Sequence, residues 1–67
     1  FERLRAVRRE IAQELGKPPY IVFSDRTLRD MTRISPVTDA QFLSVNGVGE
    51  RKLAQYGRRF MDAIGAD

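Results

Sequence analysis

The sequence contains no cysteine and no histidine among its 67 residues. It therefore has no disulfide, no thiol nucleophile, no imidazole base and none of the usual nitrogen and sulfur ligands of zinc. We predict that the chain binds no metal and no cofactor and that packing alone stabilises its fold. The absence of cysteine is also typical of a reducing compartment, so we expect a cytoplasmic location.

Long apolar segments are missing as well. No run approaches the roughly 18 residues that a membrane-spanning helix needs, and no charged and apolar leader opens the chain, so we expect no membrane partner. A chain of 67 residues can form one domain and no more. Because the chain begins with Phe1 and its helical periodicity starts almost at once, we expect residues 1–67 to be a single domain excised from a longer protein.

Acidic side chains are the minority charge, with 9 Asp and Glu against 12 Lys and Arg, which gives a net charge of +3. Ten of the twelve basic residues are arginine, whose planar guanidinium can hold a phosphate through two parallel hydrogen bonds and can stack on a base. This composition favours a nucleic-acid partner. A charge of this size also suits simple solubility, so composition alone does not decide between the two.

Helical spacing is the dominant pattern at the start of the chain. Apolar residues spaced by three, four and four positions are Leu4, Val7, Ile11 and Leu15. They predict a helix from near the start to about Leu15, ended by Gly16 and by the two prolines that follow. We expect a loop at residues 17–20. The apolar triplet at residues 21–23 has no second strand to pair with, so we expect a connector tucked into the core rather than a strand.

Three further helices are predicted from capping signals and spacing. Ser24 is the expected N-cap of a helix from Asp25 to about Arg33, with Leu28 and Met31 in the core. Thr38 and Gln41 match a capping box that opens a short helix to about Ser44. Its expected buried residues are Phe42 and Leu43. A last helix to about Ile64 has its apolar stripe at Leu53, Tyr56, Phe60, Ala63 and Ile64. We therefore predict an all-α fold, a small single-domain bundle of about four to five short helices.

The corner between the last two helices carries Gly47, Val48 and Gly49. Helix, tight glycine turn and helix form the layout of a helix-hairpin-helix, in which free backbone N–H groups at the second helix face a phosphate. Glu50 stands against that interpretation, because its carboxylate already complements the helix dipole and repels a phosphate. The alternative is a structural corner in which both glycines adopt conformations that other residues resist. Both interpretations stay open at this stage.

Several segments together resemble an HRDC domain, the helicase and RNase D C-terminal module of RecQ-family helicases. The blocks PPYIVFSD and LSVNGVG are the most specific, and they are most similar to the bacterial RecQ form. The matching residues are 1–5, 8–12, 18–25, 27–28, 43–49 and 52–53.

The resemblance implies a helical bundle that serves a DNA helicase as an auxiliary domain, with no catalysis of its own and with the ATP-dependent motor elsewhere in the parent. The chain itself has no G-x-x-x-x-G-K-[ST] phosphate loop. Implied partners are single-stranded or junction DNA, and implied roles are DNA repair and recombination in the bacterial nucleoid. In related bacterial domains, the aromatic residue of the PPY block contributes to single-strand binding. That residue is Tyr20 here.

Candidate DNA-binding residues can also be chosen from the pattern itself. Tyr20 follows two prolines in a stiff loop, where an exposed ring could stack on an unpaired base and Lys17 could meet the adjacent phosphate. Packing at the edge of the core is the alternative for this ring. The other basic candidates are Arg5, Arg8 and Arg9 on one flank of the first helix, and Lys52 and Arg59 on one edge of the last.

A protein-docking module is the competing function. Glu10 and Glu14 share the other flank of the first helix, so a surface of two signs could dock on the helicase core or a sister domain of the parent. An enzyme is the weakest hypothesis, because two exposed glutamates one turn apart are the sole candidates for acid–base chemistry or weak metal binding. We therefore predict no catalytic residue. The oligomeric state is not predicted.

Overall fold

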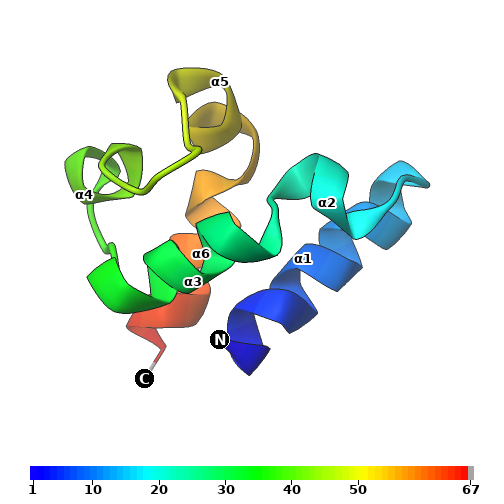
Figure 1. Ribbon diagram of the computed structural model, residues 1–67, viewed down its shortest axis with the longest axis horizontal. Coiled ribbons are helices and arrows are strands. Elements are labelled where there is room, and N and C mark those ends of the chain that lie inside the picture. Colours follow the sequence, from blue (N-terminus) through cyan, green and yellow to red (C-terminus); the bar gives the residue numbers. More distant parts are fainter. Residues whose placement is uncertain (67) are drawn as a thin grey trace.

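The computed structural model describes residues 1–66, and all regular structure in that range is helical. The all-α prediction is confirmed. The elements are α1 Glu2–Leu15, α2 Pro19–Val22, α3 Asp25–Ile34, α4 Asp39–Leu43, α5 Glu50–Lys52, the π-helix η1 Leu53–Gly57 and α6 Arg58–Gly65. The last three run on without a break, so they form one helical stretch. α1 packs against α2 and α6, and α3 lies in front of α6 in Figure 1. Within residues 1–66, no helix is both long and apolar enough to cross a membrane.

The core is organised around the ring of Phe23, which is 1% exposed. Phe42 and Phe60 meet it edge-on, with ring centroids 6.1 and 5.2 Å away, and Tyr56 does the same at 6.0 Å. These partners come from α4, η1 and α6, so one residue between α2 and α3 joins most of the bundle. Edge-to-face pairs of this kind add about 0.5–1.5 kcal/mol each beyond area burial. The prediction that Tyr56 belongs to the packing is confirmed.

The buried face of α1 differs from the predicted stripe. Leu4 and Ile11 are buried as expected, but Leu15 is 45% exposed. Ala12 and Arg8 are buried in its place, at 3% and 8% exposure. Positions 4, 8, 11 and 12 lie on one face of a helix, just as the predicted positions 4, 7, 11 and 15 do. The spacing alone therefore predicted a helix correctly and its inner face only in part.

The segment after the two prolines is a turn of helix, so the predicted loop and connector were wrong in form. Pro18 is the extended N-cap and Pro19 occupies the first turn, where its missing N–H costs nothing. This turn separates the apolar triplet into two environments. Val22 and Phe23 are buried, whereas Ile21 is 42% exposed.

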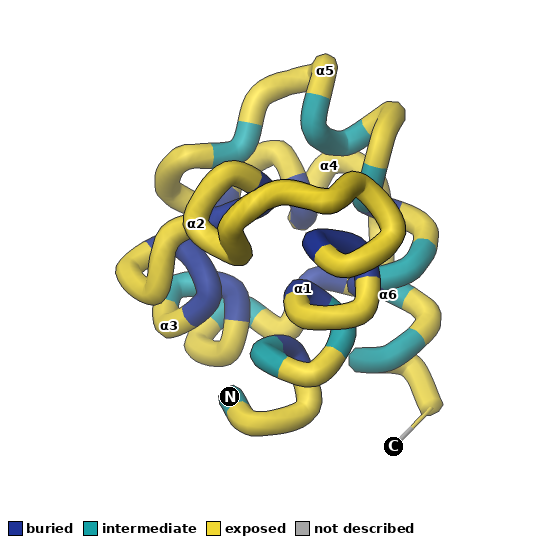
Figure 2. Tube along the Cα trace, turned by 90° about the vertical axis from the view of Figure 1, so that its right-hand side faces the viewer, coloured by how far each residue is buried: buried dark blue, intermediate teal, exposed yellow. Residues whose placement is uncertain are grey.

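The capping predictions for α3 and α4 are confirmed. The Ser24 hydroxyl accepts from the Thr27 N–H at 3.2 Å, and Thr38 and Gln41 form the reciprocal capping box. Figure 2 shows the buried residues gathered on the inner faces of the helices. Leu43, which was predicted to be buried, is 37% exposed at the end of α4.

The π-helix η1 was not predicted, because a wider turn leaves the apolar spacing almost unchanged. It coincides with Gly57, where a Cβ would lie 2.6 Å from Cδ1 of Leu53. A glycine therefore makes room for a neighbouring side chain inside the widened turn. Such turns inside α-helices are frequent at functional sites.

Candidate nucleic-acid interface

A shallow groove lies where the end of α1, α2 and the start of the last helical stretch meet, and we call it the α2–α5 groove. Its lining residues are Leu15, Lys17, Ile21, Arg51, Lys52, Gln55 and Tyr56. Three of these side chains are cations, three are apolar or aromatic, and none is a carboxylate. A volume of about 440 Å³ is large enough for a nucleotide-sized group. The groove therefore offers positive charge and apolar surface together.

Tyr20 stands beside this groove on α2, next to the lining residue Ile21. Its ring is 67% exposed, which is the largest exposure among the large apolar and aromatic side chains of residues 1–66. The interpretation as a core-edge ring is thereby excluded. A ring held on a rigid helical turn loses little conformational freedom when a base stacks on it.

The three cations of the groove are held differently. Lys52 Nζ donates to the Ile21 carbonyl at 3.3 Å and lies 5.3 Å from the centre of the Phe23 ring. Lys17 and Arg51 are exposed and form no ion pair with any residue from 1 to 66. An incoming phosphate can therefore meet Lys17 and Arg51 directly, whereas Lys52 also ties α5 to α2.

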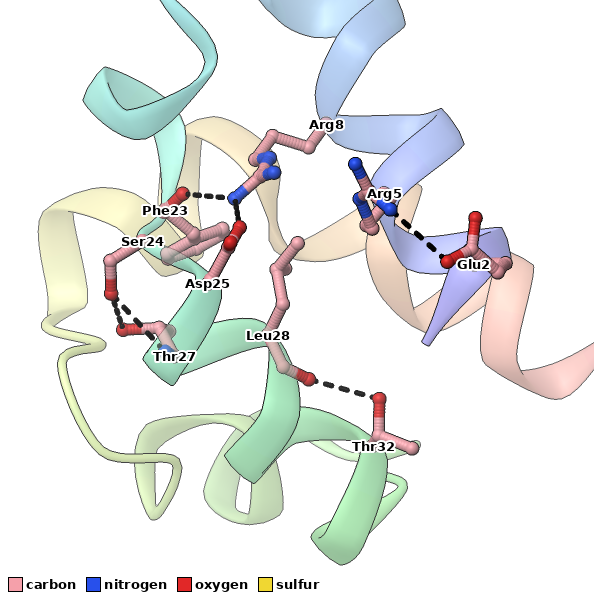
Figure 3. Close-up of polar contacts among 9 residues, drawn as sticks. All are labelled: Glu2, Arg5, Arg8, Phe23, Ser24, Asp25, Thr27, Leu28 and Thr32. Carbon is pink, nitrogen blue, oxygen red and sulfur yellow. Dashed lines mark hydrogen bonds and ion pairs between the residues drawn. The ribbon is translucent and has the colours of Figure 1, made fainter.

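Arg8 does not belong to this interface, and its placement on an open basic flank was wrong. Its side chain is 10% exposed and its Nη1 donates to the Phe23 carbonyl at 3.0 Å and to Asp25 Oδ1 at 2.8 Å (Figure 3). The hydrogen bond from this guanidinium, with its charge, holds the pKa of the Asp25 carboxyl below its usual value. Arg8 therefore stabilises the connection between α2 and α3 from inside.

Arg59 is also engaged inside the chain. Its Nη1 and Nη2 donate to the two carboxylate oxygens of Glu14 at 2.8 Å each, and Glu10 lies 3.6 Å from Nη2. This bidentate pair lowers the pKa of Glu14, chiefly through the side-chain hydrogen bond, and raises the pKa of Arg59 for the same reason. The acidic flank of α1 is thus partly neutralised by Arg59 of α6, and Glu10 and Glu14 both stay largely exposed.

The remaining predicted cations lie away from the groove. Arg5 pairs with Glu2 at 3.1 Å, as Figure 3 shows, and its guanidinium lies 5.7 Å from the centre of the Phe1 ring. Arg9 is exposed on α1 and is absent from the groove lining. The fold therefore brings together Tyr20, Lys17 and Lys52 from the predicted set.

The glycine corner is satisfied largely from within. The Asn46 N–H donates to Asp30 Oδ2 at 2.8 Å, and the Val48 N–H donates to the Val45 carbonyl at 3.2 Å. A carboxylate from α3 thus holds the Asn46 N–H inside the corner. Gly47 has φ +88°, which favours glycine, whereas Gly49 has an ordinary extended φ of −117°. The geometry favours the structural corner, and it requires a glycine at one position rather than two.

Sequence reasoning missed Arg51, Gln55 and the apolar floor of the groove. Arg51 was not among the predicted cations, and Gln55 carries no charge that would have singled it out. The floor depends on Leu15 and Ile21 being left exposed, which the apolar spacing argued against. The one sequence feature that could have pointed to Arg51 is its position next to Lys52, which was already a candidate cation.

Comparisons with known proteins agree with this architecture. The family model of the HRDC domain matches residues 1–64. The chain is 58% identical over 66 residues to the ATP-dependent DNA helicase RecQ of Bacillus subtilis, which covers 98% of this chain and 11% of that protein. It is 45% identical over 64 residues to the RecQ helicase of Haemophilus influenzae, covering 96% of this chain and 10% of the relative. The ATP-dependent DNA helicase UvrD2 of Mycobacterium tuberculosis is 40% identical over 62 residues, covering 92% of this chain and 9% of the relative.

A solved structure gives the same result for the fold. The third HRDC domain of RecQ from D. radiodurans superimposes with a TM-score of 0.93 at 38% identity, covering 97% of this chain and 86% of that one. The chain spans about a tenth of the length of the curated relatives it matches. A match of the family model over nearly the whole chain, together with this superposition, shows that the chain belongs to the HRDC domain family.

Proposed function

We propose that this chain is an auxiliary single-strand-binding domain, and that the α2–α5 groove with Tyr20 is its binding site. The observation that carries the proposal is the combination of three cations, an apolar floor and no carboxylate in one groove, beside a ring that is 67% exposed. Single-strand-binding proteins commonly pair a positive groove for the backbone with aromatic rings for the bases. The domain performs no catalysis in this proposal.

In the bound state, an unpaired base stacks on Tyr20 while the neighbouring phosphates meet Lys17 and Arg51. The apolar surface of Leu15 and Ile21 takes the face of an adjacent base or sugar. Few contacts of this kind give weak binding that depends on salt and hardly on sequence. Every natural base has a π-face, so the stacking contact does not select among bases.

The test is a titration of the isotope-labelled 67-residue chain with a short single-stranded oligonucleotide at low salt, followed through backbone amide shifts. We expect shifts at residues 15–21 and 51–56. Tyr20→Ala should weaken binding by about 1–3 kcal/mol if one base stacks there. Tyr20→Phe is the matched control, since it keeps the ring and should bind like the wild type. Tyr20→Ala could bind the single strand as tightly as the wild type while removal of the Lys17 and Arg51 charges abolishes binding. That result would mean that electrostatic attraction holds the strand and that no base stacks on Tyr20.

We further propose that the chain is one domain of a longer RecQ-type helicase, in which an ATP-dependent motor lies outside residues 1–67. The support is the set of helicases of about ten times this length that match it. In such a parent, a weak single-strand site would hold the strand near the motor and help set which DNA structures are bound. A parent variant with Tyr20→Ala should keep its ATPase activity and lose affinity for DNA with a single-stranded arm.

Docking on the helicase core or a sister domain is the second candidate function. A separate groove supports it, because Asp39, Glu50 and Arg58 there present both signs of charge around Leu53 and Met61. Mixed charge around apolar surface is typical of protein interfaces. A pull-down between this domain and the rest of the parent, weakened by Arg58→Glu, would support docking. No association at any salt concentration would count against it.

A further inference from the structure

A second basic groove lies on the outer face of α3, and we call it the α3 groove. Its lining residues are Arg26, Arg29, Asp30, Arg33 and Asn46. It shares no residue with the α2–α5 groove. In Figure 1, α3 lies in front of α6, whereas the C-terminal end of α1 lies at the right beyond α2. The two grooves are therefore formed by different elements of the domain.

The one acid in the α3 groove is already fully engaged. Asp30 Oδ1 accepts from Nε and Nη2 of Arg33 at 3.0 and 2.8 Å, and Oδ2 accepts from the Asn46 N–H at 2.8 Å. The Asn46 hydrogen bond, followed by that of Arg33, lowers the pKa of Asp30. Asp30 consequently orients the Arg33 guanidinium and fixes the corner at Asn46. Three arginines against one aspartate leave the groove with an excess of two positive charges.

The chemistry of the lining separates this groove from the first one. It contains no aliphatic or aromatic side chain, so an exposed base would find no apolar surface there and could stack on the arginine guanidinium groups alone. Arginine guanidinium groups bind phosphate oxygens in pairs of parallel hydrogen bonds. The α3 groove therefore suits a nucleic acid whose phosphates are accessible and whose bases are hidden, which is the condition of a double helix.

The spacing of the arginines fits a phosphate backbone. Arg26, Arg29 and Arg33 follow each other by three and four positions, which places them along one side of α3 over about 10 Å of helix axis at 1.5 Å per residue. Two or three consecutive phosphates of one strand extend over a comparable distance. Arg26 is exposed and forms no ion pair with residues 1–66, so it can bind a phosphate without breaking an internal contact.

We propose that the α3 groove binds the phosphate backbone of duplex DNA while the α2–α5 groove holds a single strand, so that one domain contacts both sides of a junction between single-stranded and double-stranded DNA. The duplex contact involves phosphates alone and is therefore independent of sequence. This inference extends the proposed single-strand function, and the two can fail separately because the grooves share no residue.

The experiment compares three DNA probes on the isotope-labelled chain at low salt: a 12-nucleotide single strand, a 12-base-pair blunt duplex, and that duplex with a single-stranded arm. We expect the blunt duplex to shift amides at residues 26–33 and 46, and the single strand to shift residues 15–21 and 51–56. The armed duplex should shift both sets and bind at least ten times more tightly than either simple probe.

A pair of charge-matched variants gives the decisive comparison. Arg26→Gln with Arg29→Gln leaves the contacts of Asp30 intact and removes two phosphate contacts. It should reduce duplex affinity at least tenfold and lower the slope of log K against log salt by about 1.8. Single-strand affinity should stay within twofold. The control, Arg9→Gln with Arg58→Gln, removes the same charge outside both grooves and should change duplex affinity less than twofold.

Three results would overturn the inference. Duplex and single strand could shift the same amides, which would mean one shared site. The two double variants could lose duplex affinity equally, which would mean that net charge alone acts. The α3 amides could respond to polyglutamate and to none of the DNA probes, which would make this groove a surface for an acidic protein segment. If the single strand fails to bind but the duplex shifts α3, the duplex site on α3 stands, whereas the single-strand proposal falls and the junction contact falls with it.

Discussion

Replacing Gly47 with alanine should destabilise the domain, whereas the same change at Gly49, two positions along, should be nearly neutral. Gly47 has φ +88°, and a Cβ there would lie 2.5 Å from Thr27 Oγ1. Gly49 has an extended φ of −117°, and a Cβ there would meet nothing within 4 Å. The two glycines of one turn are thus a matched pair, with the same substitution and different local geometry.

Two terms give the magnitude. A residue with a Cβ in the left-handed region costs about 1–2 kcal/mol. Thr27 is buried and its Oγ1 lies 3.1 Å from Ser24 Oγ, so moving it to admit the new methyl group sacrifices a hydrogen bond of about 0.5–1.5 kcal/mol. Together they give about 1.5–3.5 kcal/mol for Gly47→Ala. Gly49→Ala should stay within about 0.5 kcal/mol, because alanine is a poorer N-cap of α5 than glycine but also restricts the unfolded chain, and these two effects oppose each other.

Urea unfolding followed by circular dichroism measures both variants, and thermal unfolding gives a second value. For a domain of this size about 1 kcal/mol corresponds to 4–8 °C in Tm, so Gly47→Ala should melt roughly 6–28 °C below wild type. In a Thr27→Ala background the hydroxyl that crowds the new Cβ is absent. Gly47→Ala should therefore cost less in that background than in the wild type, and only the cost of the left-handed backbone should remain. Equal stabilities of Gly47→Ala and Gly49→Ala would refute this account of the corner.

Three other changes test separate parts of the structure. Arg8→Met should lower the free energy of unfolding by about 1.5–3 kcal/mol, because it removes the charged hydrogen bond to the Phe23 carbonyl. The same change at exposed Arg9 should have little effect. The midpoints of urea unfolding compare the two variants. Because the folded pKa of Asp30 lies below its ordinary 3.8, the unfolded state binds more protons in acid, and the stability this group contributes is present above pH 3.8 and lost as pH falls through the folded pKa. Unfolding at pH 7 and pH 3 should therefore show a smaller acid loss in Asp30→Asn than in wild type, and an identical loss would exclude this group. Leu43→Lys should change the melting temperature by less than about 4 °C, since the side chain is already partly in water; a larger fall would mean that it belongs to the core.

The fold was predictable from local signals because they agree with one another along most of the chain. Ser24, Thr38 and Gln41 form the caps that their residue types predict. The helical turn α2 was not predictable in the same way, since four residues are too few for a periodic pattern, and the two prolines suggested a loop. The face of α1 was ambiguous because Arg8 can bury its long stem while its Nη1 donates to a carbonyl, although its buried Nε has no partner within residues 1–66.

Three residues of the candidate site were predicted from the sequence: the aromatic residue Tyr20 and the cations Lys17 and Lys52. Tyr20 was identified from the prolines before it and from a family resemblance, and its exposure is confirmed. The choice among arginines failed at Arg8 because a helical wheel describes one helix, whereas ion pairing is decided by the neighbouring helices. Only the packing of α6 against α1 shows that Arg59 is held by Glu14. The groove itself arises from two segments, residues 15–21 and 51–56, that are distant in sequence.

Phe23 connects the interior of the domain with the surface that we propose binds DNA. Its ring packs edge-to-face with three aromatic neighbours, while Lys52 of the groove lies over it at 5.3 Å. A cation over an aromatic face is held by the ring's quadrupole. Phe23→Leu would therefore change stability and ligand affinity together, so repacking of the core cannot be expected to leave binding untouched. Lys52→Met, which keeps the apolar stem and removes the charge, is the substitution that separates the two effects.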